Sequence, residues 1–309
     1  MPPQATWKTA PVATVLVLGV GGVLGEAWMW GYLGGAHKAT GEDFRQAKQL
    51  IGTSAGSIVA ARLAGGEDPR RGEERVRWDG EAEPDRRPGT LRAALERASR
   101  VSMGAFSPLA APALTAATPG GALARAALLA RVPSGRIELR DLRSRVAALG
   151  PHFDGRLRLV AVDRGSGRRV VFGDPGAPDA SVADAVAASC AVPGLFAPVA
   201  IGDREYVDGG VWSPTNLDLA RAGKGDRVLC LVPTAAMGTG PSLALRGLAT
   251  GWRLATSVEA AAGRRRGASV EIVAPDTGAA SAMGPDLMNP ARRTRVVAEG
   301  FRQGTARAG

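Results

Sequence analysis

Histidine is scarce in this sequence: only His37 and His152 occur among its 309 residues. We place His37 on a predicted surface helix and His152 in a predicted turn, and we interpret both as ordinary surface side chains. A Ser-His-Asp triad of the α/β-hydrolase order needs a histidine late in the chain, but none follows His152. The scarcity therefore argues against such a triad. Because the acidic residues are also scattered, we expect no bound metal and no cofactor.

Cysteine is equally rare. Cys190 and Cys230 both lie among apolar residues, which is typical of buried free thiols and does not suggest a disulfide framework or a metal site. No long hydrophobic run opens the chain either: the apolar run 12–20 is too short to span a membrane and leads directly into the fold. We therefore expect a first strand there, not a signal peptide, and a reducing, cytoplasmic setting.

Acidic residues are too few to balance the basic ones, which are mostly arginines, and the formal net charge is +10. Excess arginine can mark a nucleic acid or an acidic membrane surface as the partner. Aromatic residues do not interleave with the basic runs at 264–266 and 292–293, however. We therefore expect no nucleic acid partner, and we expect most of the charge to be spread over a solvated surface.

Strands and helices alternate in the predicted order of elements, which is typical of an α/β fold. Continuous apolar runs such as 12–18 indicate strands that are covered on both faces. We predict a three-layer α/β/α sandwich with a mostly parallel central sheet, formed by residues 1–309 as a single domain. Residues 65–150 are expected to form a helical cap or insert region. The predicted strands span residues 12–18, 49–51, 157–163, 169–172, 205–207, 227–232 and 270–274.

A G-x-S-x-G pattern stands between the second predicted strand and the second predicted helix. It consists of Gly52, Ser54 and Gly56 within QLIGTSAGSIVAARL. A serine at a sharp strand-to-helix turn has an exposed hydroxyl and a strained backbone, and the helix N-terminus offers free N–H groups to an anion. Glycines are needed on both sides because a Cβ would collide with the neighbouring strand and helix. The pattern predicts a nucleophile, although an ordinary glycine-rich turn remains an alternative.

A serine hydroxyl needs a base, and without a suitable histidine the base must be a carboxylate. The candidate is Asp208 in YVDGGVWSPTN, which follows a short predicted strand. Gly209 and Gly210 after it let the chain turn sharply and let another backbone approach. A carboxylate with an ordinary pKa near 4 is a weak base, so a close and poorly solvated contact is required. The alternative is a structural Asp-Gly-Gly turn.

A third glycine-rich segment, GVGGVLG at 19–25, follows the first predicted strand. Successive backbone N–H groups in such a loop can bind an anion, which in acyl transfer is the oxyanion. A dinucleotide site is the rival, but Leu24 stands where the G-x-G-x-x-G pattern requires glycine. A P-loop is excluded because the segment contains no Gly-Lys-Ser/Thr.

These segments, in this order, resemble the patatin-like phospholipase family. ASCAVPGLFAPV and YVDGGVWSPTN are similar to the family's stretch around its aspartate, and MNPARRTRVVAEGFRQG resembles the last helix of bacterial members. The resemblance implies a dyad with Ser54 as nucleophile and Asp208 as base. It also implies an oxyanion hole formed by backbone N–H groups of Gly21, Gly22 and Val23. The family loop usually reads Gly-Gly-Gly-x-Arg/Lys-Gly, from which this chain departs.

The expected function is that of a serine acyl hydrolase, which cleaves lipid ester bonds through an acyl-enzyme. The apolar segment 101–132 is expected to contribute a wall or lid for the acyl chain. Transient, peripheral association with an anionic membrane surface would suit the basic charge. The alternatives are a carboxylesterase or acyltransferase with the same dyad, and a catalytically silent binding protein of this fold. The departures at Val20 and Leu24 favour the silent protein, whereas the intact dyad residues argue against it.

Overall fold

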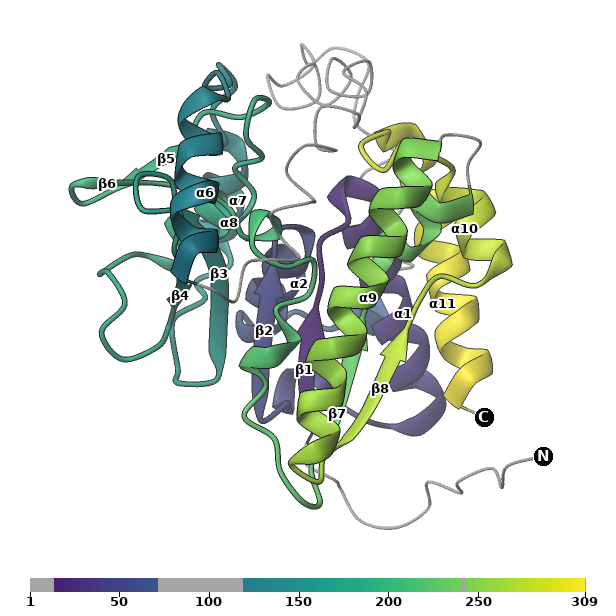
Figure 1. The fold of residues 1–309 in the computed structure, drawn as a ribbon. Coiled ribbons are helices and arrows are strands. Elements are labelled where there is room, and N and C mark those ends of the chain that lie inside the picture. Colours follow the sequence, from purple (N-terminus) through teal and green to yellow (C-terminus); the bar gives the residue numbers. More distant parts are fainter. Residues whose placement is uncertain (1–13, 72–118, 240–242, 309) are drawn as a thin grey trace.

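A mixed β-sheet forms the centre of the protein (Figure 1), seen here in a computed structural model that describes residues 14–71, 119–239 and 243–308. Successive hydrogen-bonded neighbours run β5-β6-β3-β2-β1-β7-β8, and β4 pairs with β3. The pairs β1–β2, β1–β7, β2–β3 and β7–β8 are parallel, whereas the pairs that involve β4 or β6 are antiparallel. The strands are β1 (Thr14–Leu18), β2 (Gln49–Thr53), β3 (Leu157–Asp163), β4 (Arg169–Phe172), β5 (Val199–Ile201), β6 (Arg204–Asp208), β7 (Arg227–Leu231) and β8 (Ser269–Val273).

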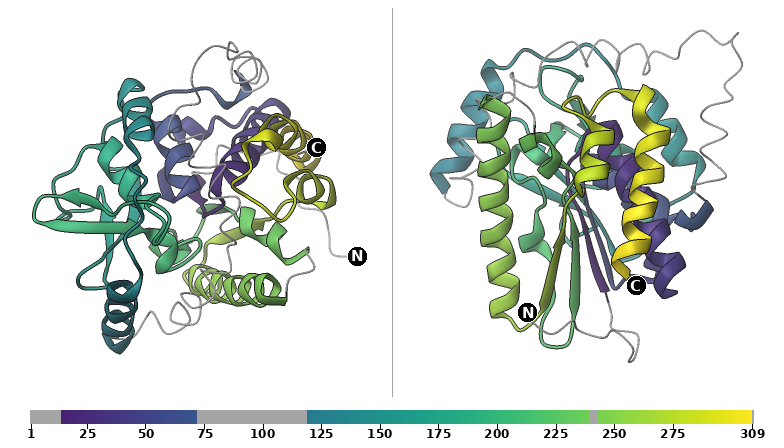
Figure 2. Two further views of the ribbon diagram at one scale, coloured as in Figure 1. Left: turned by 90° about the horizontal axis from the view of Figure 1, so that it is seen from above. Right: turned by 90° about the vertical axis from the view of Figure 1, so that its right-hand side faces the viewer.

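Helices cover both faces of this sheet, and α9 lies on the face opposite α1 and α11 (Figure 2). In β1, Leu16 and Leu18 belong to the cluster that contains residues of α1 and α2, while Val15 and Val17 belong to the cluster that contains Ala260 of α9. Every β1 residue is therefore buried, as its continuous apolar sequence predicts. The α-helices of the described ranges are α1 (Gly22–Thr40), α2 (Ala55–Ala64), α6 (Pro119–Arg131), α7 (Arg140–Ala148), α8 (Val182–Ser189), α9 (Leu243–Arg265), α10 (Thr277–Met283) and α11 (Arg293–Ala308).

The predicted three-layer α/β/α class is thus confirmed. Both cysteines are free and buried, as predicted. The expected cap region, residues 65–150, lies partly outside the described residues. Segment 101–118 of the expected acyl-chain wall lies entirely outside them. Within the described part, Leu129 of α6 packs against Val162 and Val207 at the β3–β6 side of the sheet.

The prediction for His37 is wrong. Its helix, α1, is not a surface helix, because α11 covers the side that faces away from the sheet, and His37 is only 6% exposed. α1 is apolar nearly all round, which is typical of a helix that is buried on every side. The imidazole lies 3.9 Å from the Asp68 carboxylate, and burial lowers its pKa below the usual value.

Glycines on both helices allow α1 and α11 to pack closely. A Cβ at Gly31 or Gly35 would meet backbone atoms of α11, and a Cβ at Gly300 or Gly304 would meet backbone atoms of α1. In α1, the glycines therefore serve helix packing at positions where they weaken the helix intrinsically.

We predict that Gly304→Ala destabilises the fold, because the added Cβ would lie against the Tyr32 carbonyl oxygen. Such overpacking costs about 1–3 kcal/mol of unfolding free energy, which urea denaturation measures. The matched control is Gly251→Ala on α9, where nothing lies within 4 Å of the added methyl. There, the higher helix propensity of alanine should stabilise the fold by up to about 1 kcal/mol. Equal effects of the two substitutions would contradict this packing account.

Candidate active site

Ser54 occupies a strained turn between β2 and α2. Its backbone has φ +54° and ψ −120°, a conformation that costs a non-glycine residue free energy. The two flanking glycines are sterically required, as the sequence predicts. A Cβ at Gly52 would lie 2.6 Å from the Ser57 Cα, and a Cβ at Gly56 would collide with the Leu18 carbonyl oxygen of β1. The close contact of α2 with β1 and β2 thus forces the chain into this turn.

Hydrogen bonds from α8 and from α2 hold the strained residue in place. The Ser54 N–H donates to Ser189 Oγ at 2.9 Å, and the Ser189 hydroxyl donates to the Val160 carbonyl of β3 at 2.6 Å. The Ser54 carbonyl accepts from the Ser57 hydroxyl at 2.6 Å and from the Cys190 thiol at 3.3 Å. Burial raises the pKa of that thiol, which keeps it a neutral donor.

Ser189 is part of the site but was not among the residues predicted from the sequence. The residue lies in the ASCAVPGLFAPV stretch, which carries the family resemblance but no pattern of its own that marks this serine. Its contacts with Ser54 and Val160 join segments that are distant in the chain, so no local pattern indicates them.

The pairing of β3 brings Asp208 next to Ser54. β4 pairs with residues 159–162 of β3, β2 with 157–160 and β6 with 161–163. On β3, β4 overlaps with β2 at residues 159–160 and with β6 at residues 161–162. A strand has only two edges, so β4 occupies one edge of β3, and β2 and β6 share the other. They meet there with their C-terminal ends together: Thr53 is opposite Val160, and Asp208 is opposite Ala161. The predicted nucleophile and base therefore follow one another along one strand edge.

Asp208 is a buried carboxylate with few partners, being only 3% exposed. Its Oδ1 accepts a hydrogen bond from the Gly210 N–H at 2.7 Å, and its Oδ2 is buried without a hydrogen bond of ordinary geometry in the described part of the chain. Burial raises the pKa of Asp208 to about 7, although the Ser54 hydroxyl and the Gly210 N–H lower it in part. The Ser54 hydroxyl is thus close enough to influence the carboxyl group. In unliganded enzymes such contacts are often long and tighten only when substrate binds.

The glycine loop supplies unpaired backbone donors at the N-terminus of α1. The Leu24 N–H donates to the Leu287 carbonyl at 2.9 Å. In the described ranges, by contrast, the N–H groups of Gly21, Gly22 and Val23 have no hydrogen-bond partner. Three free donors at a helix N-terminus stabilise a negative charge that lies within hydrogen-bond distance of them.

This loop lies beside both other parts of the site. β1 ends at Leu18, which is paired with Gly52, two residues before Ser54. A Cβ at Gly210 would lie 2.8 Å from the Val20 side chain, so the loop also contacts the turn after Asp208. Leu24, which stands where the resembling family has a basic residue, is fully buried in the core. The departure at position 24 therefore adds to the core and brings no charge to the loop.

Glu26, a second buried carboxylate, lies one turn into α1. It pairs with Arg62 of α2 at 2.6 Å and with Arg293 of α11. Burial alone would raise the pKa of Glu26, but Arg293 and Arg62 lower it to about 2. A permanently ionised, doubly paired carboxylate joins three helices and is unsuited to exchange protons near neutral pH. Asp208, which has no cationic partner among the described residues, has the opposite properties.

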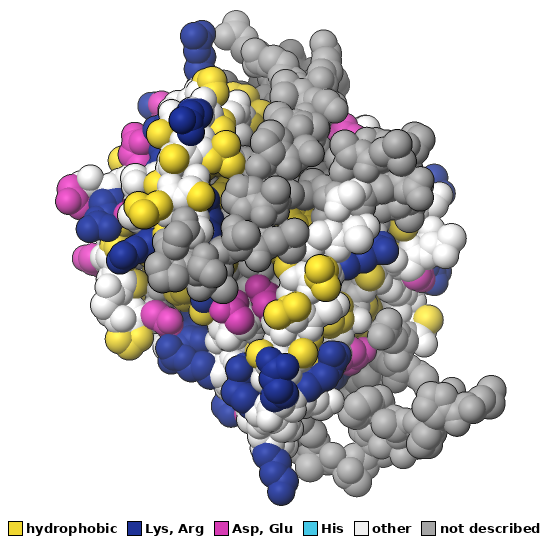
Figure 3. All heavy atoms as spheres, viewed as in Figure 1, with side chains coloured by type: hydrophobic (Ala, Val, Ile, Leu, Met, Phe, Trp, Pro, Cys, Tyr) yellow, Lys and Arg dark blue, Asp and Glu magenta, His cyan; other side chains and the backbone are white. Residues whose placement is uncertain are grey.

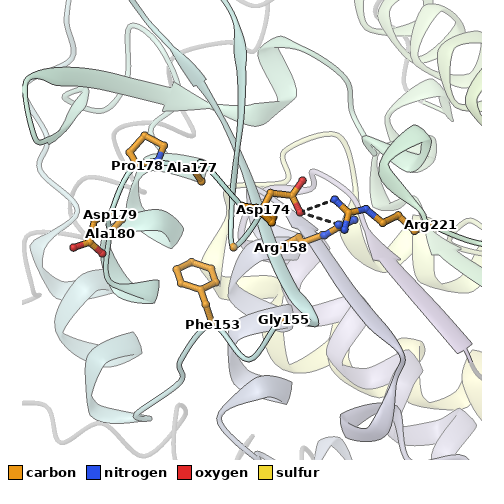
Figure 4. Close-up of a pocket in the computed structure, with 11 residues that line it drawn as sticks. Phe153, Gly155, Arg158, Asp174, Ala177, Pro178, Asp179, Ala180 and Arg221 are labelled. Carbon is orange, nitrogen blue, oxygen red and sulfur yellow. Dashed lines mark hydrogen bonds and ion pairs between the residues drawn. The ribbon is translucent and has the colours of Figure 1, made fainter.

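A separate pocket opens at the other end of β3 (Figure 4). Its volume is about 490 Å³, and it contains none of the predicted site residues. At its wall, Asp174 pairs with Arg158 at 2.8 Å and with Arg221 at 3.2 Å, so the charges there are largely matched. In the described residues, no group of three histidine, cysteine or acidic side chains could hold a metal ion.

Comparisons with known proteins identify the family to which the chain belongs. No curated protein matches the sequence significantly. Among solved structures, the crystal structure of VipD from Legionella pneumophila is similar at 17% identity, with a TM-score of 0.43, over 96% of this chain and 67% of that one. The family model described as patatin-like phospholipase matches residues 16–221, which include the glycine loop, Ser54 and Asp208. The chain therefore belongs to the patatin-like phospholipase family.

Proposed function

We propose that this chain is a serine acyl hydrolase that cleaves lipid ester bonds with Ser54 as nucleophile and Asp208 as base. Membership of the family supports lipid acyl hydrolysis in general. The observation that carries the finer proposal is the position of Asp208: a buried carboxylate with a pKa of about 7 directly follows the strained serine along the edge of β3. Its pKa suits a base that works near neutral pH.

Each step of the proposed reaction uses groups of the candidate site. Asp208 accepts the Ser54 hydroxyl proton while the serine oxygen attacks the ester carbonyl carbon. The developing oxyanion accepts hydrogen bonds from the free N–H groups of Gly21, Gly22 and Val23. The intermediate collapses by expelling the alcohol, which takes the proton from Asp208. Water, deprotonated by Asp208, then attacks the acyl-serine and releases the fatty acid, and the proton returns to Ser54.

Hydrolysis of p-nitrophenyl esters of graded chain length tests this proposal. The wild type should hydrolyse them, increasingly well with longer chains, and Ser54→Ala and Asp208→Asn should each lose at least about a thousandfold in kcat, as expected for groups that act as a unit. Circular dichroism should show all three to be folded. A preference for short chains would instead support a carboxylesterase. Wild-type rates in either folded variant would contradict the dyad, and an inactive folded wild type would favour a catalytically silent binding protein.

The raised pKa of Asp208 sets the expected pH dependence. The base must be deprotonated, so kcat/KM should rise with pH and level off above about pH 7. Below about pH 7, kcat/KM should fall about tenfold for each pH unit, because the deprotonated fraction of Asp208 falls by the same factor. Stopped-flow assays over the pH range in which the fold is stable measure the profile. A limb near pH 4 would mean that the carboxylate is solvated in the free enzyme and would contradict its burial.

We further propose that α6 and α9 form the face that approaches an anionic lipid surface. In the described residues, the large apolar side chains that remain exposed are Leu123 of α6 at 74%, and Leu254 and Val258 of α9 at 59% and 61%. Both helices lie on the face shown in Figure 3, where yellow side chains mark them and dark blue ones gather beside the end of α9. α6 contains no acidic residue and α9 only Glu259. No described helix is both long and apolar enough to cross a bilayer, so the proposed contact is peripheral.

Co-sedimentation with phosphatidylcholine vesicles, with and without phosphatidylglycerol, tests this face. Binding should increase with the anionic lipid and weaken with salt. Leu254→Ser with Val258→Ser should lower the partition coefficient about tenfold, because the two side chains no longer enter the interface. Ser257→Ala, on the same helix, is the control and should bind like the wild type. Unchanged binding of the double variant would rule this face out.

A further inference from the structure

Glu259 is the only acidic residue of α9, and its carboxylate turns inward to a buried loop. It accepts hydrogen bonds from the Ser213 hydroxyl at 2.7 Å, the Thr215 hydroxyl at 2.8 Å and the Leu217 N–H at 2.8 Å. All three donors belong to residues less than 4% exposed. One carboxylate therefore organises a whole loop, here named the 213–217 loop.

The 213–217 loop begins five residues after Asp208 and contacts the other two parts of the candidate site. The Pro214 carbonyl accepts from the Val20 N–H at 2.9 Å, at the start of the glycine loop. The Asn216 side-chain amide donates to the Thr53 hydroxyl at 3.1 Å, one residue before Ser54. Asn216 has φ +52°, in the left-handed region that asparagine tolerates better than most residues. The loop thus connects the nucleophile strand to the oxyanion donors.

No cation pairs with Glu259 in the described part of the chain, although its carboxylate is shielded from solvent. Burial and then Asp218 raise the pKa of Glu259, and the hydrogen bonds from Ser213, Thr215 and Leu217 oppose them. A buried acidic group without a counter-ion is costly, and an apolar side chain would pack the helix against the sheet at lower cost. Unlike an apolar side chain, a carboxylate has two oxygens that accept hydrogen bonds from several donors at once.

We propose that Glu259 is a positioning residue for the hydrolase reaction: through the 213–217 loop it sets the distance between Ser54 and the free N–H groups at Gly21, Gly22 and Val23. This inference rests on the proposed function. Acyl transfer requires the oxyanion donors to lie about 3 Å from the oxygen that becomes charged. A displacement of about 1 Å in such a site can cost a hundredfold in rate. A displaced loop would move the Val20 N–H and the Thr53 hydroxyl relative to each other.

Glu259→Gln tests the role with little change in shape. The amide replaces one acceptor oxygen with a donor, so at least one of the three loop hydrogen bonds is lost. For a short p-nitrophenyl ester, kcat should fall about tenfold to a hundredfold while KM stays within twofold. Glu299→Gln, a carboxylate of α11 that pairs with Arg302, is the matched control and should keep wild-type values of both.

Substitutions at Thr215 test the same contact from the loop side, and they decide the matter if Glu259→Gln fails to fold. Thr215→Ser keeps the donor hydroxyl, so its kcat should stay within about threefold of the wild-type value. The isosteric Thr215→Val lacks this donor, and its kcat should fall about as much as that of Glu259→Gln. If the two groups act through one bond, Thr215→Val combined with Glu259→Gln should be less impaired than the product of the single effects.

Three outcomes would overturn the positioning role. One is a wild-type kcat for folded Glu259→Gln. Another is a loss of thermal stability in which the folded fraction reacts at the wild-type rate, which would make Glu259 purely structural. The last is a wild type without Ser54-dependent hydrolysis, which removes the proposed function and this role with it. The wild-type and Ser54→Ala arms of the assay separate that last case from the first two.

Discussion

The strained conformation of Ser54 is the constraint on which the rest of the site depends. A serine with φ +54° persists only where its surroundings leave no alternative. Here, Gly52 and Gly56 let β1, β2 and α2 approach so closely that the chain must turn at this residue. Ser189 then fixes the Ser54 N–H from α8. The strained residue lies at the turn between β2 and α2, on the strand next to β1, and β1 leads into the glycine loop.

The second element is an unusual meeting of strands. β6 runs antiparallel to β3 and occupies the same edge as β2, so the two strands end against each other. This brings Asp208 beside Ser54. The neighbours of Asp208 there are β3, α8 and the turn at Gly209 and Gly210. The same burial that brings the groups together raises the pKa of Asp208 to about 7, which makes it a stronger base than a solvated aspartate. Position and basicity thus have one structural cause.

The sequence was sufficient for the motifs and for every strand except β5 (Val199–Ile201), because these depend on local patterns. Apolar runs located the strands, and the glycines of the three motifs located the turns around Ser54 and Asp208. The buried His37, the Ser189 contact and the Glu259 network could not be predicted, since each depends on segments that meet only in the fold. The burial of α1 by α11, for example, follows from glycines on two helices more than 250 residues apart along the chain. The end-to-end contact of β2 and β6 is likewise a matter of register, which alternation of apolar residues does not specify.

The central claim, that Ser54 is an activated nucleophile, is tested most directly by reaction with a fluorophosphonate followed by mass spectrometry of the digested protein. We expect one modified site, at Ser54, whose rate of modification rises with pH through about 7 and falls sharply in Asp208→Asn. Failure of the folded wild type to react, or modification at other serines at the same rate, would contradict it.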